Sequence, residues 1–171
     1  MKHAYFIAGT DTGIGKTHAA CALLHAFRAQ GRSVVGMKPV AAGVEANGEN
    51  EEVTLLRAAS NVVADAALIN PYCFREPIAP HIAAADAGVT VAIPRIKEAL
   101  AALQAQADVV LVEGVGGLRV PLGEDVDAAD LAVALALPVI LVVGMRLGCL
   151  NHALLTLEAL QSRGLTLAGW I

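Results

Sequence analysis

A glycine-rich stretch near the start of the chain restricts the possible folds more than any other feature. Residues 9–17 read GTDTGIGKT and stand between an apolar run, YFIA, and a helical pattern that begins HAACALLHAF. A strand, a glycine-rich turn ending in Gly-Lys-Thr and a helix are the context that a P-loop requires. Gly9, Gly13 and Gly15 let successive backbone N–H groups point inward, and the helix start adds partial positive charge. The stretch therefore predicts a site for the phosphates of ATP.

The last two residues of this loop, Lys16 and Thr17, are expected to have different roles. Lys16 can reach the β- and γ-phosphates, and the Thr17 hydroxyl can ligate Mg²⁺. The spacing is a variant, because five residues separate Gly9 from Gly15 and Thr10 stands at the usual place of the first glycine. We expect nucleotide contacts from six consecutive residues: Gly13, Ile14, Gly15, Lys16, Thr17 and His18.

The rest of the chain fits a P-loop NTPase-like α/β fold, a parallel sheet with helices on both faces. Its 171 residues suit one domain, 1–171, and are 56% hydrophobic but only 4% aromatic, as expected for Ala-, Val- and Leu-rich helices on a buried sheet. Strands are expected at Ala4–Ala8, Ser33–Met37, Val109–Val112, Val139–Val143 and Leu165–Trp170. Helices are expected at Gly15–Gln30, Glu51–Ser60, Pro94–Gln106, Asp127–Leu135 and Asn151–Arg163, and residues 40–50 as a loop.

Charge and hydropathy exclude two classes of partner. A formal net charge of −4 argues against nucleic-acid binding, which needs a dense basic face. No uninterrupted apolar run reaches the length of a membrane span, about 18 residues or more. The cysteines, Cys21, Cys73 and Cys149, are odd in number and lack CxxC spacing, which is typical of reduced thiols in a cytoplasmic protein.

The last four residues continue an apolar run that has the pattern of a buried strand. Domains rarely end inside a core strand, since chain termini usually lie at the surface. We therefore expect the domain to be truncated at its C-terminus.

Two further charged residues are expected beside the phosphate loop. Glu113 follows the apolar run Val109–Val112 and precedes Gly114-Val115-Gly116, where the backbone could pass close to a phosphate. Lys38 follows the strand expected at Ser33–Met37, and the carboxyl ends of parallel strands meet at one edge of a sheet. A lysine there can stabilise developing negative charge. Glu51 and Glu52 stand at a helix start, where they could serve a metal or simply complement the helix dipole.

Five ordered blocks resemble the dethiobiotin synthetase family over the whole chain. They are GTDTGIGKT at 9–17, MKPVAAG at 37–43, NPYCFREPIAPHIAA at 70–84, LVEGVGGLRVPL at 111–122, and PVILVVGMRLGCLNHALLTLEAL followed by GLTLAGW at 138–170. In that family 7,8-diaminopelargonic acid takes up CO2 as a carbamate, ATP phosphorylates the carbamate, and the mixed anhydride closes to the cyclic urea of dethiobiotin.

The resemblance implies a role for each matching residue. Lys16 becomes a phosphate ligand, Lys38 the lysine that holds the carbamate and its phosphorylated form, and Thr12 a neighbour of the reacting groups. Thr17, Glu52 and Glu113 become Mg²⁺ ligands, with Gly114, Val115 and Gly116 beside the nucleotide. The segment around Gly148 and Asn151 would hold the substrate carboxylate across a homodimer interface, as expected of a helix N-terminus.

This sequence departs from the family pattern at a few positions. Glu52 stands where the family commonly has an aspartate metal ligand. Ala42 stands where it usually has serine, so only backbone contacts to the substrate are expected there. The family's adenine-contacting segments lie beyond residues 165–170, so we expect base recognition to be incomplete within these residues.

Three alternative functions fit the sequence less well. A partner-regulated ATPase switch of the partitioning or septum-site type would carry a second lysine four residues before the last loop glycine, where this chain has Asp11. A related amidotransferase-type synthetase would need a glutaminase domain, for which the length leaves no room. A GTP-specific switch would need an Asn-Lys-x-Asp motif, which does not occur.

Overall fold

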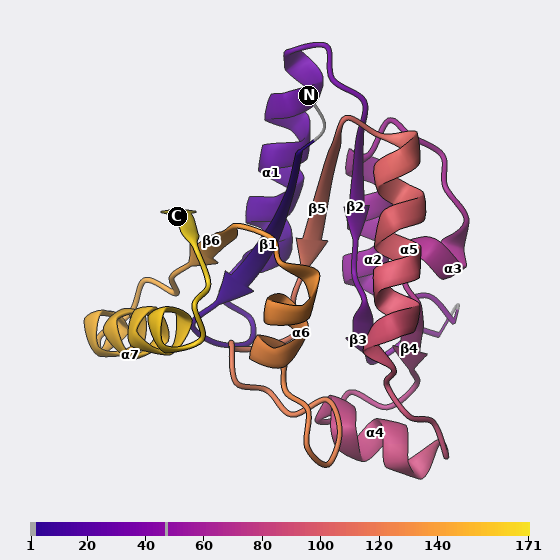
Figure 1. Ribbon diagram of the computed structural model, residues 1–171. Helices are drawn as coiled ribbons and strands as arrows, with labels where there is room; N and C mark the ends of the chain where they lie inside the picture. Colours follow the sequence, from indigo (N-terminus) through magenta and orange to yellow (C-terminus); the bar gives the residue numbers. More distant parts are fainter. Residues whose placement is uncertain (1–2, 47) are drawn as a thin grey trace.

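Five parallel strands form the central sheet of the computed structural model, which describes residues 3–46 and 48–171 (Figure 1). Their spatial order is β2-β5-β1-β6-β7. The bounds are β1 His3–Gly9, β2 Val34–Met37, β5 Val109–Glu113, β6 Val139–Val142 and β7 Leu167–Trp170. Strand β1 pairs with β5 on one side and β6 on the other, so the phosphate loop that follows β1 leaves from the middle of the sheet.

Helices cover both faces of this sheet, as the alternation of side chains in its strands requires. On one face Ile7 and Leu111 pack against Leu24 of α1 (Lys16–Ala29) and Leu56 of α2 (Glu51–Ala59). On the other face, residues of β1 and β5 share a core with α5 (Ile93–Gln106) and α6 (Ala128–Leu135). The predicted fold class is confirmed.

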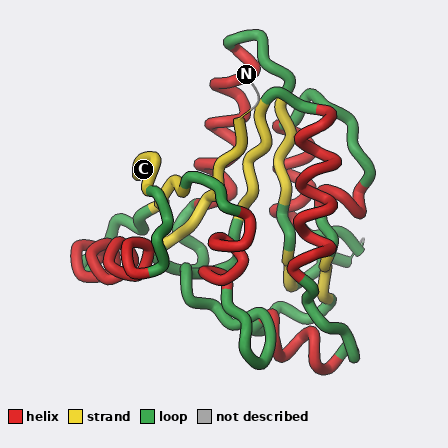
Figure 2. Tube along the Cα trace, viewed as in Figure 1, coloured by secondary structure: helices red, strands yellow, loops and turns green. Residues whose placement is uncertain are grey.

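Helix α7 (Cys149–Ser162) covers less of the sheet than the other long helices. Figures 1 and 2 show it beside the β6–β7 edge, away from the layers formed by α1 and α5. Its only fully buried residue is Leu160. Strand β7 confirms the strand predicted at residues 165–170, but it is an edge strand of half-buried and exposed residues, with Trp170 71% exposed. The expectation that residues 168–171 follow a buried strand was wrong.

The expectation of an unbroken loop over residues 40–50 was also wrong. Val40–Ala42 form β3, which pairs in parallel with β4 (Tyr72–Phe74) in a separate two-stranded sheet. Two short helices, α3 (Ala66–Ile69) and α4 (Pro80–Asp86), were not predicted. Elements of three to seven residues are too short to show a helical or strand period in sequence. The other helices and strands begin and end within two residues of the predicted positions.

Within the described residues no helix is long and apolar enough to cross a membrane. The polypeptide instead buries its apolar residues between the sheet and its helices.

The contact between α1 and the sheet predicts a specific loss of stability. Leu24 is fully buried between α1 and the strands, so Leu24→Ala should lower the free energy of unfolding by about 2–5 kcal/mol. Val63 is almost fully exposed, and Val63→Ala should change the same quantity by less than about 0.5 kcal/mol. Urea denaturation followed by circular dichroism measures both. Equal effects of the two substitutions would contradict this packing.

Candidate active site

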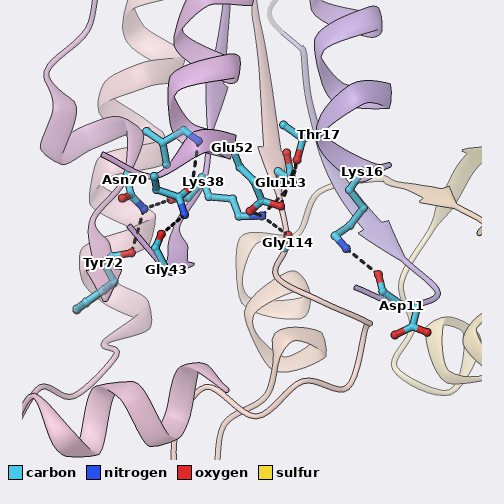
Figure 3. A network of polar contacts seen from close by, with 12 residues as sticks. Asp11, Lys16, Thr17, Lys38, Gly43, Glu52, Asn70, Tyr72, Glu113 and Gly114 are labelled. Atoms are coloured by element: carbon cyan, nitrogen blue, oxygen red, sulfur yellow. Dashed lines mark hydrogen bonds and ion pairs between the residues drawn. The ribbon is translucent and has the colours of Figure 1, made fainter. Parts of the chain in front are cut away.

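The carboxyl ends of β1, β2 and β5 bring the phosphate loop, Lys38 and Glu113 to one edge of the sheet. Figure 3 shows the side chains of Lys38 and Glu113 meeting Glu52 from α2 and Thr17 from α1, while Lys16 points to Asp11. The prediction that Lys38 and Glu113 share this edge is confirmed by a direct contact, with Lys38 Nζ 2.8 Å from Glu113 Oε1. The parallel order β2-β5-β1 makes the contact possible, because β2 and β5 are hydrogen-bonded neighbours.

The phosphate loop turns through two glycines with positive φ. Gly13 has a φ of 68° and Gly15 a φ of 95°, values that residues with a Cβ adopt only at a cost. Lys16 lies back along the loop and donates from Nζ to the carbonyl oxygen of Asp11 at 2.8 Å. The lysine stem fits because a Cβ on Gly9 would lie only 2.8 Å from Lys16 Cδ.

Lys16 is almost completely buried, which affects its ionisation. Burial lowers the pKa of its ammonium group, and the neighbouring positive charge of Lys38 lowers it further. The carboxylates of Glu113 and Glu52 oppose this effect. A phosphate beside Lys16 would supply the negative charge that a buried ammonium group favours.

Lys38 and Glu113 form the buried centre of the site, with exposed side-chain fractions of 1% and 0%. The Lys38 ammonium group has three oxygen partners: Glu113 Oε1 at 2.8 Å, Glu52 Oε2 at 2.7 Å and the carbonyl oxygen of Gly114 at 3.1 Å. Three partners match the three donors of an ammonium group. The lysine is therefore fixed in position despite its flexible stem.

Thr17 joins the same group of oxygens from the first turn of α1. Its hydroxyl donates to Glu113 Oε1 at 2.8 Å, and Glu52 Oε1 lies 3.4 Å away. The second oxygen of Glu113, Oε2, is buried and has no hydrogen-bond partner within the described residues. A buried carboxylate oxygen is ordinarily satisfied, so this one suits a cation.

The oxygens of Glu113, Glu52 and Thr17 suit a magnesium ion, because Mg²⁺ does not need all of its ligands from the protein. The described residues contain no group of three or more His, Cys, Asp or Glu side chains suited to a metal. Mg²⁺ is commonly held by one or two carboxylates, with water and nucleotide phosphates completing its shell. Glu113, Glu52 and the Thr17 hydroxyl match that requirement.

Glu52, rather than Glu51, faces the side chains of Lys38 and Thr17. Burial raises the pKa of the Glu52 carboxyl, but the charge and hydrogen bond of Lys38 outweigh that effect and leave the pKa below its usual value of 4.5. The side chain is still 46% exposed. Glu51, its neighbour at the start of α2, is exposed.

Two asparagines support the site and were not identified from sequence. Asn50 caps α2 by accepting from the backbone N–H of Val53 at 3.2 Å, and its Nδ2 donates to the Gly43 carbonyl at 2.7 Å. Asn70 donates from Nδ2 to the carbonyl oxygens of Lys38 at 2.6 Å and Tyr72 at 2.9 Å. The cap could have been found, since asparagine directly before a helical pattern is a start signal. Asn70 has no comparable local signal.

The other predicted site residues lie around this centre. Thr12 is exposed at the tip of the phosphate loop, and a Cβ on Gly116 would lie 3.2 Å from its Oγ1. His18 is exposed on the first turn of α1, and Ala42 is half-buried at the end of β3. Ile14 is half-buried in the phosphate loop, and Val115 is half-buried after β5.

Gly148 and Asn151 do not join this group within one chain. They lie at the start of α7, which follows β6, whereas Lys38 follows β2. Strands β5 and β1 stand between β2 and β6, so the two strands are three spacings, or roughly 14 Å, apart.

Sequence comparisons agree with this geometry. A family model described as "AAA domain" matches residues 3–171. The ATP-dependent dethiobiotin synthetase BioD of Aromatoleum aromaticum is 64% identical over 171 residues, covering 98% of this chain and 76% of that protein. The proteins of the same name from Nitrosospira multiformis and Ralstonia nicotianae are 55% and 56% identical, covering 100% and 97% of this chain and 75% and 74% of theirs.

Solved structures with much lower identity share the fold. The kinase domain of the Escherichia coli tyrosine kinase ETK superposes with a TM-score of 0.61 at 15% identity, covering 99% of this chain and 66% of that one. The septum-site-determining protein MinD of Pyrococcus horikoshii, in complex with Mg-ADP, gives 0.59 at 16% identity, covering 99% and 69%. At this identity the likeness concerns the fold alone.

The sheet, the loop and the converging charged side chains define a P-loop nucleotide-binding protein. The extended similarity to named relatives makes the assignment more specific: the chain belongs to the family of ATP-dependent dethiobiotin synthetases.

The ion pair of Glu52 predicts a pH-dependent contribution to stability. Since the pKa of Glu52 is lowered in the folded protein, its contribution is present above pH 4.5 and is lost as the pH falls through the folded-state value. Glu52→Gln should therefore destabilise the protein more at pH 7 than at pH 3, as measured by urea denaturation at each pH. The matched control is Glu51→Gln on the exposed neighbour. The same pH dependence in both variants would contradict the assignment.

Proposed function

We propose that this site carboxylates 7,8-diaminopelargonic acid and closes the product to dethiobiotin with consumption of ATP. One amine of the substrate attacks CO2 and loses a proton, which gives a carbamate. A carbamate oxygen attacks the γ-phosphorus, and the bond to ADP breaks. The second amine then attacks the carbonyl carbon of the mixed anhydride and loses a proton, and phosphate leaves as the cyclic urea forms.

The phosphate loop supplies the nucleotide side of the site. Backbone N–H groups of Gly13, Ile14 and Gly15 and the ammonium of Lys16 bind the phosphates, with His18 and Val115 at the edges of the nucleotide. Lys16 Nζ donates to the Asp11 carbonyl oxygen, and a bound phosphate would replace that acceptor.

Thr17, Glu52 and Glu113 would hold Mg²⁺. The unpartnered Oε2 of Glu113 supports this role, because a buried carboxylate oxygen without a donor favours a cation. When bound, Mg²⁺ neutralises negative charge on the phosphates. Gly114 and Gly116 keep the following backbone close to the site, and a Cβ on Gly114 would lie 3.0 Å from Phe6 Cζ.

Lys38 holds the carbamate and the transferring phosphoryl group in place of its contact with the half-exposed Glu52, with Thr12 beside them. The buried Lys38–Glu113 pair is the observation that carries this proposal, since it fixes a positive charge next to the end of the phosphate loop. A charge fixed in advance stabilises developing negative charge without reorganisation. A switch ATPase would use a lysine at position 11 instead, and that residue is Asp11.

The substrate carboxylate lies at the start of α7 of a partner copy, in contact with Gly148 and Asn151, while Ala42 contacts the substrate through its backbone. Within one chain the start of α7 is separated from β2 by two strands, which favours a second copy as its source. Large apolar side chains of residues 145–155, at and before the start of α7, are exposed: Met145, Leu147, Leu150, Leu154 and Leu155. Such a patch is typical of a protein interface. We infer a homodimer with a cytoplasmic location.

The role of Lys38 is tested by Lys38→Met. Turnover, followed as ATP-dependent incorporation of labelled bicarbonate into acid-stable product, should fall by about a thousand-fold because the fixed charge is lost. Affinity for Mg-ADP should stay within about threefold, since Lys16 and the loop backbone are intact. Lys97→Met, on the exposed side of α5, is the control. Turnover of Lys38→Met near that of the wild type would refute the role of Lys38. No incorporation by the wild type, with ATP bound normally, would refute the function.

The dimer is tested by Leu150→Glu. A charge in an apolar interface is costly, so the variant should be monomeric by light scattering at concentrations where the wild type is a dimer. Glu124→Gln, in the turn before α6, serves as a control that should stay dimeric. A wild type that is monomeric and fully active would exclude a shared site.

A further inference from the structure

Arg146 connects the segment between β6 and α7 to the phosphate loop. Nη2 of its guanidinium group forms an ion pair with Asp11 Oδ2. The other oxygen of Asp11, Oδ1, accepts from the backbone N–H of Thr12 at 2.8 Å. The Thr12 hydrogen bond and the Arg146 guanidinium together lower the pKa of Asp11 below its usual value, so the residue is a carboxylate at neutral pH.

Further contacts hold this segment against the loop. The backbone N–H of Gly144 donates to Thr10 Oγ1 at 3.2 Å, and the N–H of Thr10 donates to the Val142 carbonyl at 3.1 Å. A Cβ on Gly144 would lie 2.4 Å from Ile14 Cγ2, a distance that real side chains do not reach. Residues 142–146 therefore lie directly on residues 10–14, and Arg146 is the charged end of that contact.

The same segment sets the start of α7. The N–H of Arg146 donates to the Gly144 carbonyl at 3.0 Å, and the N–H of Cys149 donates to the Arg146 carbonyl at 2.9 Å. Gly148 follows with a φ of 96°, which turns the chain into the helix. The first N–H groups of α7 thus follow a turn that is anchored at Arg146.

We propose that Arg146 is a positioning residue that, through Asp11, fixes the start of α7 on its own subunit and thereby tunes affinity for the carboxylate end of the substrate that binds in the partner copy. This inference rests on the proposed role of Gly148 and Asn151. Arg146 acts on the substrate through the α7 start and does not touch the reacting atoms. The carboxylate at position 11, which distinguishes this loop from those of switch ATPases, is the partner that Arg146 requires.

The pair is suited to positioning rather than to stabilising the fold. The Arg146 and Asp11 side chains are 57% and 42% exposed, and ion pairs in such surroundings add little to the free energy of folding. Substitutions should therefore leave the thermal midpoint unchanged. Small displacements of a binding group still weaken ligand binding, because binding depends on the geometry being formed in advance.

The experiment compares steady-state kinetics of Arg146→Met, Asp11→Asn and the double variant. Each single change should raise the KM for the diamino acid by about fivefold and leave kcat within about twofold, the pattern of lost binding without lost transition-state stabilisation. The double variant should be no worse than either single variant, because both remove the same contact. Arg146→Lys keeps the charge and should restore most of the affinity. Arg32→Met, at the far end of β2, is the control.

Asn151→Ala separates this inference from the proposed function. If Asn151→Ala raises the KM while Arg146→Met and Asp11→Asn do not, the positioning role is wrong and the substrate site stands. Additive effects of the two single changes would also overturn the positioning role. If Asn151→Ala leaves the KM unchanged as well, the substrate carboxylate binds elsewhere and both proposals fall.

Discussion

Lys38 and Glu113 carry opposite charges into a part of the protein where neither side chain is more than 1% exposed. Removing either partner of such a pair costs about 3–5 kcal/mol, because the other charge is then buried alone. The pair therefore constrains everything around it: β2 and β5 must be neighbours, and their ends must be in register. Glu52 contacts Lys38, and Thr17 contacts Glu113, so the positions of α2 and α1 are linked to this pair.

The phosphate loop combines glycines in an unusual backbone conformation with a buried lysine, and both features lie where a phosphate is expected to bind. Two glycines with positive φ turn the loop, and Lys16 is buried against β1 although burial disfavours its charge. Asn50 and Asn70 hold the neighbouring segments by hydrogen bonds to backbone carbonyls, one starting α2 and the other joining β2 to β4. These contacts lie outside the site chemistry, yet they hold Glu52 and Lys38 in position.

The two sides of the sheet edge differ in how completely they are covered. Around β2 and β5 the charged side chains are buried and paired, whereas around β6, β7 and α7 large apolar side chains are exposed. The segment that ends at Arg146 connects these sides, since it contacts the phosphate loop and also starts α7. In the proposed homodimer, this contact sets the position of the α7 start that one copy presents to the substrate of the other.

The sequence by itself determined the parallel α/β fold, the phosphate loop and the presence of Lys38 and Glu113 at one edge, because strand periodicity and glycine spacing are local signals. It could not choose between Glu51 and Glu52 or identify Asn70, and it missed β3 and β4, which pair only with each other. Only the tertiary structure decided those points, and it also showed that the strand predicted at residues 165–170 is an edge strand and that residues 168–171 are not buried. Which side chains meet depends on strand order and helix orientation, which no short window of sequence contains.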